Sequence, residues 1–95
     1  MEIKKAASAG TLESSDILVS LEKGENGIEI HLSSTVDKLF GQQIREIISK
    51  TLTDLGVQNI KVIAMDRGAL DCTIKARVLA AYYRATESTD YKWGE

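Results

Sequence analysis

Two short segments in the first third of the chain alternate between apolar and polar residues. Alternation over residues 16–21 and 28–32 has the period of a β-strand with one buried face. The intervening Gly24-Glu25-Asn26-Gly27 is typical of a turn. Together, the two segments and the turn predict a β-hairpin. The residues expected on the buried faces are Ile17, Val19 and Leu21 in the first segment, and Ile28, Ile30 and Leu32 in the second.

A long amphipathic helix is predicted after these strands. Apolar residues recur every three or four positions between residues 36 and 55, and we expect this face to pack in the core. Ser34 or Thr35 can accept a hydrogen bond from the free amides of the first turn, where Asp37 adds a favourable charge. Gly56 suits a left-handed C-terminal cap. The predicted buried residues are Val36, Leu39, Phe40, Ile44, Ile47, Ile48, Leu52 and Leu55.

The second half of the chain predicts one more strand and one more helix. Residues 59–65 are rich in isoleucine and valine, as in a well-covered strand, and Asp66-Arg67-Gly68 turns the chain. Residues 69–78 fit the period of a strand or that of a helix. Because no helix breaker occurs between residues 69 and 84 and alanines are frequent, we predict a helix from about Asp71.

The predicted element order is therefore β-β-α-β-α. This order indicates an α+β sandwich, with the helices packed on one face of a small sheet. A chain of 95 residues has room for one compact domain. We divide it into a flexible N-terminal arm over residues 1–15, a single α+β domain over 16–85 and a C-terminal tail over 86–95.

Composition narrows the range of functions. The formal net charge of -2 gives no general attraction to nucleic acid or to an anionic membrane. One cysteine excludes an internal disulfide and a cysteine-rich zinc site, and one histidine argues against a histidine-based metal site or triad. The first residues carry no apolar run typical of a signal peptide, and no segment has the length of a membrane helix. We expect a cytoplasmic protein.

His31 and Cys72 are the two residues with the most reactive side chains. His31 falls on the polar side of a predicted strand, with only Ser33 and Ser34 as nearby partners, so we expect it to face solvent. Cys72 at the start of a helix has the position of a nucleophile whose thiolate is favoured. A small buried thiol is the more common role for such a residue, and we favour it.

The remaining polar groups form no recognisable constellation. Glu13, Asp66 and Asp71 match no metal-ligand spacing, so turn, cap and surface roles account for them. Gly10 with Lys4-Lys5 lacks the spacing of a phosphate-binding loop, and no helix start follows it. We therefore predict no catalytic residues and no metal site.

The segment Ala9-Gly10-Thr11-Leu12-Glu13-Ser14-Ser15-Asp16 is polar and contains two accessible serines. A serine on such a segment can enter the active site of a modifying enzyme. From the residues alone, a serine that hydrogen bonds to its own backbone in a turn is the more common role. Aromatic residues near the C-terminus are candidates for contact with a partner; they are Tyr82, Tyr83, Tyr91 and Trp93.

Three separated segments carry a resemblance to a known family. The segment from Ala9 to Asp16, the helical Phe40-Gly41-Gln42-Gln43-Ile44, and Gly68-Ala69-Leu70-Asp71-Cys72-Thr73-Ile74-Lys75-Ala76-Arg77-Val78 resemble the citrate lyase acyl carrier proteins, the gamma chains of that enzyme. The segments occur in the same order as in the family. The resemblance covers nearly the whole chain except about the last ten residues.

The resemblance implies a site of covalent attachment. In that family the modified serine directly follows the glutamate of the first motif, which is Ser14 here. The next position is glycine or serine in the family, so Ser15 is expected to remain unmodified. The attached group would be 2'-(5''-phosphoribosyl)-3'-dephospho-coenzyme A, joined through a phosphodiester.

The resemblance also implies a non-catalytic carrier role. The group would carry acetyl and citryl thioesters while citrate is cleaved to oxaloacetate and acetate. The expected partners are the transferase (alpha) and lyase (beta) subunits and the prosthetic-group transferase. The fold should differ from the helical bundle of ordinary acyl carriers, in which an aspartate precedes the serine. Two alternatives stay open: the carrier subunit of malonate decarboxylase, which would carry a malonyl thioester, and a non-covalent assembly module.

Overall fold

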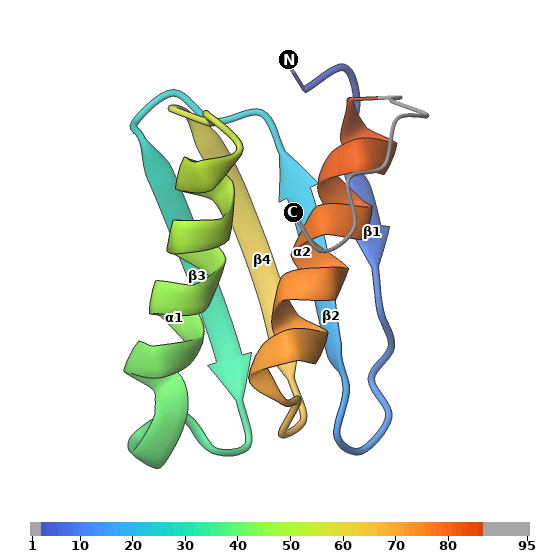
Figure 1. Ribbon diagram of the computed structural model, residues 1–95, viewed down its shortest axis with the longest axis vertical. Coiled ribbons are helices and arrows are strands. Elements are labelled where there is room, and N and C mark those ends of the chain that lie inside the picture. Colours follow the sequence, from blue (N-terminus) through green and yellow to red (C-terminus); the bar gives the residue numbers. More distant parts are fainter. Residues whose placement is uncertain (1–2, 87–95) are drawn as a thin grey trace.

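A mixed sheet of four strands is covered on one face by two helices in the computed structural model, which describes residues 3–86 (Figure 1). The predicted α+β class is confirmed, and the fold is not a helical bundle. The helices pack on one face of the sheet, as predicted. In chain order the elements are β1 (Ala7–Ala9), β2 (Ile17–Glu22), β3 (Ile28–Ser34), α1 (Asp37–Asp54), β4 (Ile60–Asp66) and α2 (Asp71–Ala85).

The sheet has the strand order β1-β2-β4-β3, so the predicted hairpin of β2 with β3 is wrong. Strand β4 lies between them, antiparallel to β2 and parallel to β3. Parallel neighbours need a crossover connection, and α1 provides it between β3 and β4. Residues Ile60, Val62 and Ala64 of β4 are almost completely buried, as expected for a central strand.

The glycine-rich segment between β2 and β3 crosses the beginning of β4. A Cβ atom on Gly24 would lie 2.7 Å from the carbonyl carbon of Ile60, so only glycine fits this approach without a shift. The amide of Ile60 donates to the carbonyl of Gly27 at 3.0 Å, and the Gly27 amide donates to Oδ1 of Asn59 at 2.9 Å. The turn signal was therefore correct for a loop but not for a hairpin.

The N-terminal segment is part of the sheet. The prediction that residues 1–15 form a flexible arm is wrong for Ala7–Ala9, which pair antiparallel with Leu21–Val19 of β2. Ile3 is buried, and the amides of Lys4 and Lys5 donate to the carbonyl of Ala85. A strand of three small residues shows no clear hydrophobic alternation, which is why the pattern does not predict it. Residues 10–15 of the expected arm form the loop that follows this strand.

Helix α1 buries the middle and the end of its predicted apolar face. Ile44, Ile48 and Leu52 are buried, whereas Leu39 and Phe40 remain 80% and 49% exposed. The first turn of α1 extends past the end of β3 (Figure 1). The expected burial of Leu39 and Phe40 is therefore wrong: Leu39 is largely exposed and Phe40 is about half exposed.

Backbone hydrogen bonds fix the C-terminal end of α1, and a side-chain hydroxyl accepts a hydrogen bond just before its N-terminal end. Gly56 adopts φ 82° as predicted, and its amide donates to the Thr53 carbonyl while the Val57 amide donates to that of Leu52. At the other end, Oγ of Ser34 accepts from the amide of Val36 rather than from a first-turn amide. The expected charge effect of Asp37 concerns a side chain outside the described part of the structure.

Residues 71–85 form the predicted helix, α2. Its last two turns pack into the core, where Tyr82 and Tyr83 are only 2% and 3% exposed. Their predicted role in partner contact is therefore wrong, while Tyr91 and Trp93 lie outside the described residues. Of the predicted tail, Thr86 is buried at the end of α2, and the rest lies outside the described residues. Within residues 3–86, neither helix has the length and apolar character needed to cross a membrane.

Candidate attachment site for a covalent group

The segment with the two serines forms the loop between β1 and β2. It lies at the end of the sheet where β4 ends and α2 begins, since Ile17 is the register partner of Asp66 (Figure 1). Ser14 and Ser15 are both exposed. The Ser14 hydroxyl has no hydrogen-bond partner among residues 3–86. Its oxygen is therefore open to solvent.

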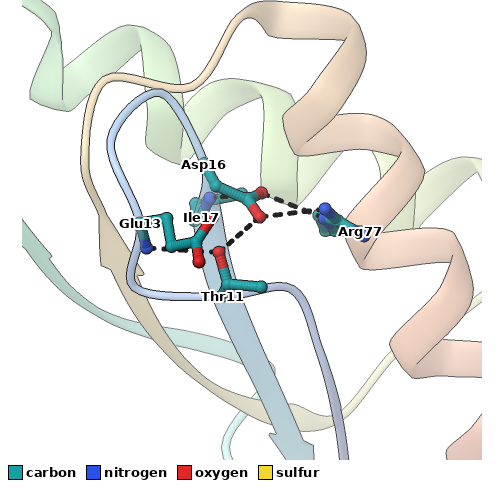
Figure 2. Close-up of polar contacts among 5 residues, drawn as sticks. All are labelled: Thr11, Glu13, Asp16, Ile17 and Arg77. Carbon is teal, nitrogen blue, oxygen red and sulfur yellow. Dashed lines mark hydrogen bonds and ion pairs between the residues drawn. The ribbon is translucent and has the colours of Figure 1, made fainter.

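A bidentate ion pair closes this loop onto helix α2 (Figure 2). The Arg77 guanidinium donates from Nε to Oδ1 of Asp16 at 3.0 Å and from its terminal nitrogen to Oδ2 at 2.9 Å. The same carboxylate accepts from the Thr11 hydroxyl and from the amide of Ile17, each at 2.7 Å. Four hydrogen bonds thus converge on one carboxylate, and Arg77, which donates two of them, lies 61 residues further along the sequence. This geometry fixes both ends of the loop.

The ionised form of Asp16 is strongly favoured in this arrangement. Hydrogen bonds from Arg77 and then from Thr11 lower the pKa of the Asp16 carboxyl from 3.8 to about 2, although burial alone would raise it. The Asp16 side chain is 13% exposed and that of Arg77 38% exposed. Because the pair is only partly accessible to water, it is less screened than an ordinary surface pair.

The loop is also bonded to the turn between β4 and α2. The amide of Ser15 donates to the Arg67 carbonyl at 2.8 Å, and the Arg67 amide donates to the carbonyl of Asp16 at 2.9 Å. Ser15 has a φ of 64°, the left-handed conformation that glycine adopts without strain. This conformation gives a physical reason why glycine suits the position after Ser14.

A buried carboxylate organises the facing turn. Asp66 is 2% exposed, and its Oδ2 accepts from the Ser34 hydroxyl at 2.8 Å. Its two oxygens also accept from the amides of Gly68 and Ala69, each at 3.0 Å. The predicted turn role of Asp66 is confirmed. The bonds connect the end of β3 to the turn before α2.

The other candidate residues lie apart from this loop. His31 is exposed, as predicted, and pairs with Glu29 at 3.0 Å. Cys72 is exposed in the first turn of α2, so the expectation of a buried thiol is wrong.

The residues considered above as ligands of a phosphate or a metal ion do not form a cluster in the described part of the chain. Lys4 and Lys5 bond through their amides to Ala85 at the end of α2, and β1 separates them from Gly10. A Cβ atom on Gly10 would collide with the carbonyl of Ile17, so this glycine has a steric role. Glu13 is exposed in the loop.

Two contacts of the site were missed by sequence reasoning. Arg77 pairs with Asp16, and the amide nitrogen of Gln43 donates to both oxygens of Asp71 at 3.0 Å. Each contact joins two of the three segments that carry the resemblance to acyl carrier proteins. The matching of these three segments to one family was the sequence signal that could have indicated the contacts, because the segments meet at one end of the fold.

The comparisons first define a class of protein. The family model described as "Malonate decarboxylase delta subunit (MdcD)", an acyl carrier protein model, matches residues 4–85. A solved Pseudomonas malonate decarboxylase hetero-tetramer in complex with malonate contains a chain of the same fold, with a TM-score of 0.74. That likeness covers 86% of this chain and 84% of the other at 18% identity, so it concerns the fold alone. Fold and family model thus indicate a small α+β acyl carrier.

Curated relatives then specify the family. The citrate lyase acyl carrier protein of Lacticaseibacillus casei strain BL23 is 55% identical over 95 residues, covering 100% of this chain and 94% of the relative. That of Lactobacillus helveticus strain DPC 4571 is 59% identical over 90 residues, covering 95% and 93%. That of Lactiplantibacillus plantarum is 56% identical over 93 residues, covering 98% and 97%. The chain belongs to the citrate lyase acyl carrier protein family.

Replacement of Asp16 by asparagine tests the contribution of its ion pair with Arg77. Its lowered pKa means that the carboxylate stabilises the fold above about pH 4 and loses this effect as the pH falls towards 2. We expect Asp16→Asn to lower the free energy of unfolding by about 1 to 3 kcal/mol at pH 6. The difference from the parent protein should shrink towards pH 2 in urea titrations.

A surface pair provides the matched control for Asp16. Asp54 pairs with Lys50 at 3.1 Å, and both side chains are well exposed. We expect Asp54→Asn to change the free energy of unfolding by only about 0.5 kcal/mol. Equal losses for the two variants at pH 6, or a loss at Asp16 that does not depend on pH, would contradict this interpretation.

Replacement of Ser15 by glycine should relieve the strain of the left-handed backbone conformation at this position. We expect Ser15→Gly to raise the free energy of unfolding by about 0.5 to 1 kcal/mol, because a left-handed serine costs about 1 to 2 kcal/mol and glycine returns part of this as chain entropy. Ser14→Gly is the control, because Ser14 has no positive φ. It should lower the same quantity by about 0.4 to 1 kcal/mol. A loss of stability in Ser15→Gly would refute the argument.

Proposed function

We propose that this protein is the acyl carrier subunit of citrate lyase and that Ser14 is its site of attachment. The observation that carries the proposal is the identity of 50% or more with citrate lyase acyl carrier proteins along essentially the whole chain. The carrier itself is non-catalytic in this proposal. The proposed group is 2'-(5''-phosphoribosyl)-3'-dephospho-coenzyme A, bonded through its phosphate to Oγ of Ser14.

The geometry of the loop fits a covalent phosphodiester. An attachment serine must be accessible to a modifying enzyme, and its oxygen must not be engaged elsewhere. Ser14 is exposed, and its hydroxyl has no partner among residues 3–86. The neighbouring Ser15 has a constrained backbone and an amide that is already bonded to Arg67. Ser15 is exposed as well, so the choice of Ser14 rests on the family resemblance, and the constrained backbone of Ser15 supports it.

The residues of this chain anchor the group, whose terminal thiol would carry acetyl and citryl groups as thioesters. Asp16, Arg77 and Thr11 fix the loop, so the anchor point keeps a defined position on the domain. Tethering presents the thiol to each partner at an effective concentration of about millimolar, as a short flexible linker does. The chemical steps themselves belong to the partner subunits.

The partners that we propose are the transferase (alpha) subunit, the lyase (beta) subunit and a prosthetic-group transferase. The names of the curated relatives imply a multi-subunit enzyme, which supports the first two. The third is proposed because attachment of the group to Ser14 needs a catalyst, and the carrier itself is non-catalytic in this proposal. A cytoplasmic location stays a prediction from the sequence.

A carrier role in malonate decarboxylase is the second candidate. It is supported by the description of the matching family model and by the shared fold with the Pseudomonas complex. The identity with that solved chain is 18%, against 55% with a citrate lyase carrier. Citrate lyase is therefore the better-supported function.

Intact mass measurement tests the attachment site directly. The chain is coexpressed with its prosthetic-group transferase, as are Ser14→Ala and the control Ser15→Ala. We expect the parent and Ser15→Ala proteins to gain the mass of one group and Ser14→Ala to gain nothing. An adduct that persists in Ser14→Ala would disprove the site.

The same samples separate the alternative functions. Complete absence of an adduct, together with full activity of a complex that contains Ser14→Ala, would instead indicate a non-covalent assembly module. Assembled complexes are then supplied with citrate or with malonate in parallel. Turnover of citrate alone is the expected result, and turnover of malonate alone would establish the second candidate.

A further inference from the structure

A solvent-open cavity of about 480 Å³ lies between the first turns of α1 and α2. Ile44 and Ile74 line it and are buried, so its floor is apolar. The ring of Phe40 forms part of its rim and remains 49% exposed. This volume lies within the range of small-molecule sites in proteins, which is about 300 to 1,000 Å³.

The cavity adjoins the loop that contains Ser14. Gly68 and Ala69 line the cavity, and they directly follow Arg67, whose carbonyl accepts from the Ser15 amide. The turn from Arg67 to Ala69 thus lies between the loop and the cavity. Two residues of chain span at most about 7 Å, so the turn that separates the Arg67 carbonyl from the cavity is short.

The polar lining of the cavity suits a planar base with an amino group. The amide nitrogen of Gln43 donates to both oxygens of the Asp71 carboxylate and holds it in place at the cavity edge. Each carboxylate oxygen has two lone pairs, so Asp71 can still accept a further hydrogen bond. A negative charge at this edge disfavours a phosphate, while the exposed face of Phe40 offers stacking to an aromatic ring.

We propose that this cavity binds the adenine base of the group attached to Ser14. The base would stack on Phe40, and its amino group would donate to Asp71. With the base held against the domain, only the thiol-ended remainder of the group would extend towards the partners. This inference rests on the proposed function, since it requires an adenine-containing group at Ser14.

Methyl NMR of the modified protein tests the proposal. The chain is labelled at isoleucine and valine methyl groups and modified by its transferase, and complete modification is verified by intact mass. We expect the resonances of Ile44 and Ile74 to shift on modification and to show NOEs to adenine protons. The methyl groups of Val57, which lines a separate cavity near Gly24 and Asn59, should not shift.

Two matched variants on one helix locate the contact. Phe40→Ser removes the proposed stacking partner, whereas Leu39→Ser alters a neighbour that is 80% exposed and does not line the cavity. We expect the NOEs from adenine to Ile44 and Ile74 to be lost in Phe40→Ser and kept in Leu39→Ser. The unchanged resonances of Val57 verify that both variants are folded.

Distinct outcomes overturn the two proposals. Full modification without shifts at Ile44 and Ile74, or with identical NOEs in both variants, would overturn the adenine site while leaving the proposed function intact. Shifts that occur only after addition of a partner subunit would identify a protein docking surface instead and would also overturn it. The absence of any mass increase would overturn the proposed function and the adenine site together.

Discussion

Strand β4 is the element on which the rest of the structure depends. It pairs antiparallel with β2 and parallel with β3, so it joins the two halves of the sheet. Its inward side chains are completely or almost completely buried beneath the helices. Its last residue, Asp66, then bonds to Ser34 and to the turn before α2. The same strand therefore completes the core and positions the end of the domain where the Ser14 loop lies.

The Ser14 loop is held against the domain by hydrogen bonds and is not an unattached arm. The Asp16 carboxylate accepts hydrogen bonds from both the loop and helix α2, and the Ser15 amide bonds to the facing turn. The loop nevertheless leaves the Ser14 hydroxyl exposed. Under the proposed function, an anchor of this kind confines motion to the group attached at Ser14, which suits a carrier that presents one thiol to several active sites.

The sequence predicted which helices and strands form better than it predicted which strands pair with one another. Hydrophobic period identified α1, β2 and β3, because each of these elements buries one face. An apolar run rich in isoleucine and valine identified β4, and helix propensity decided between strand and helix for α2. The hydrophobic period of a strand shows which of its faces is buried, but it does not show which strand lies beside it. It therefore could not show that β4 separates β2 from β3. The ion pair of Asp16 with Arg77 links positions 61 residues apart and leaves no local pattern. Ser14 was distinguished from Ser15 only by family resemblance, and the positive φ of Ser15 now adds a physical reason.

The central claim is that hydrogen bonds to α2 and to the β4–α2 turn fix the loop around Ser14. Backbone ¹⁵N relaxation of residues 11–16 in the unmodified protein tests this claim most directly. The account predicts order parameters of about 0.85, the value of rigid backbone, similar to those of β2. Values below about 0.6 across these residues would show a flexible arm and would contradict the account.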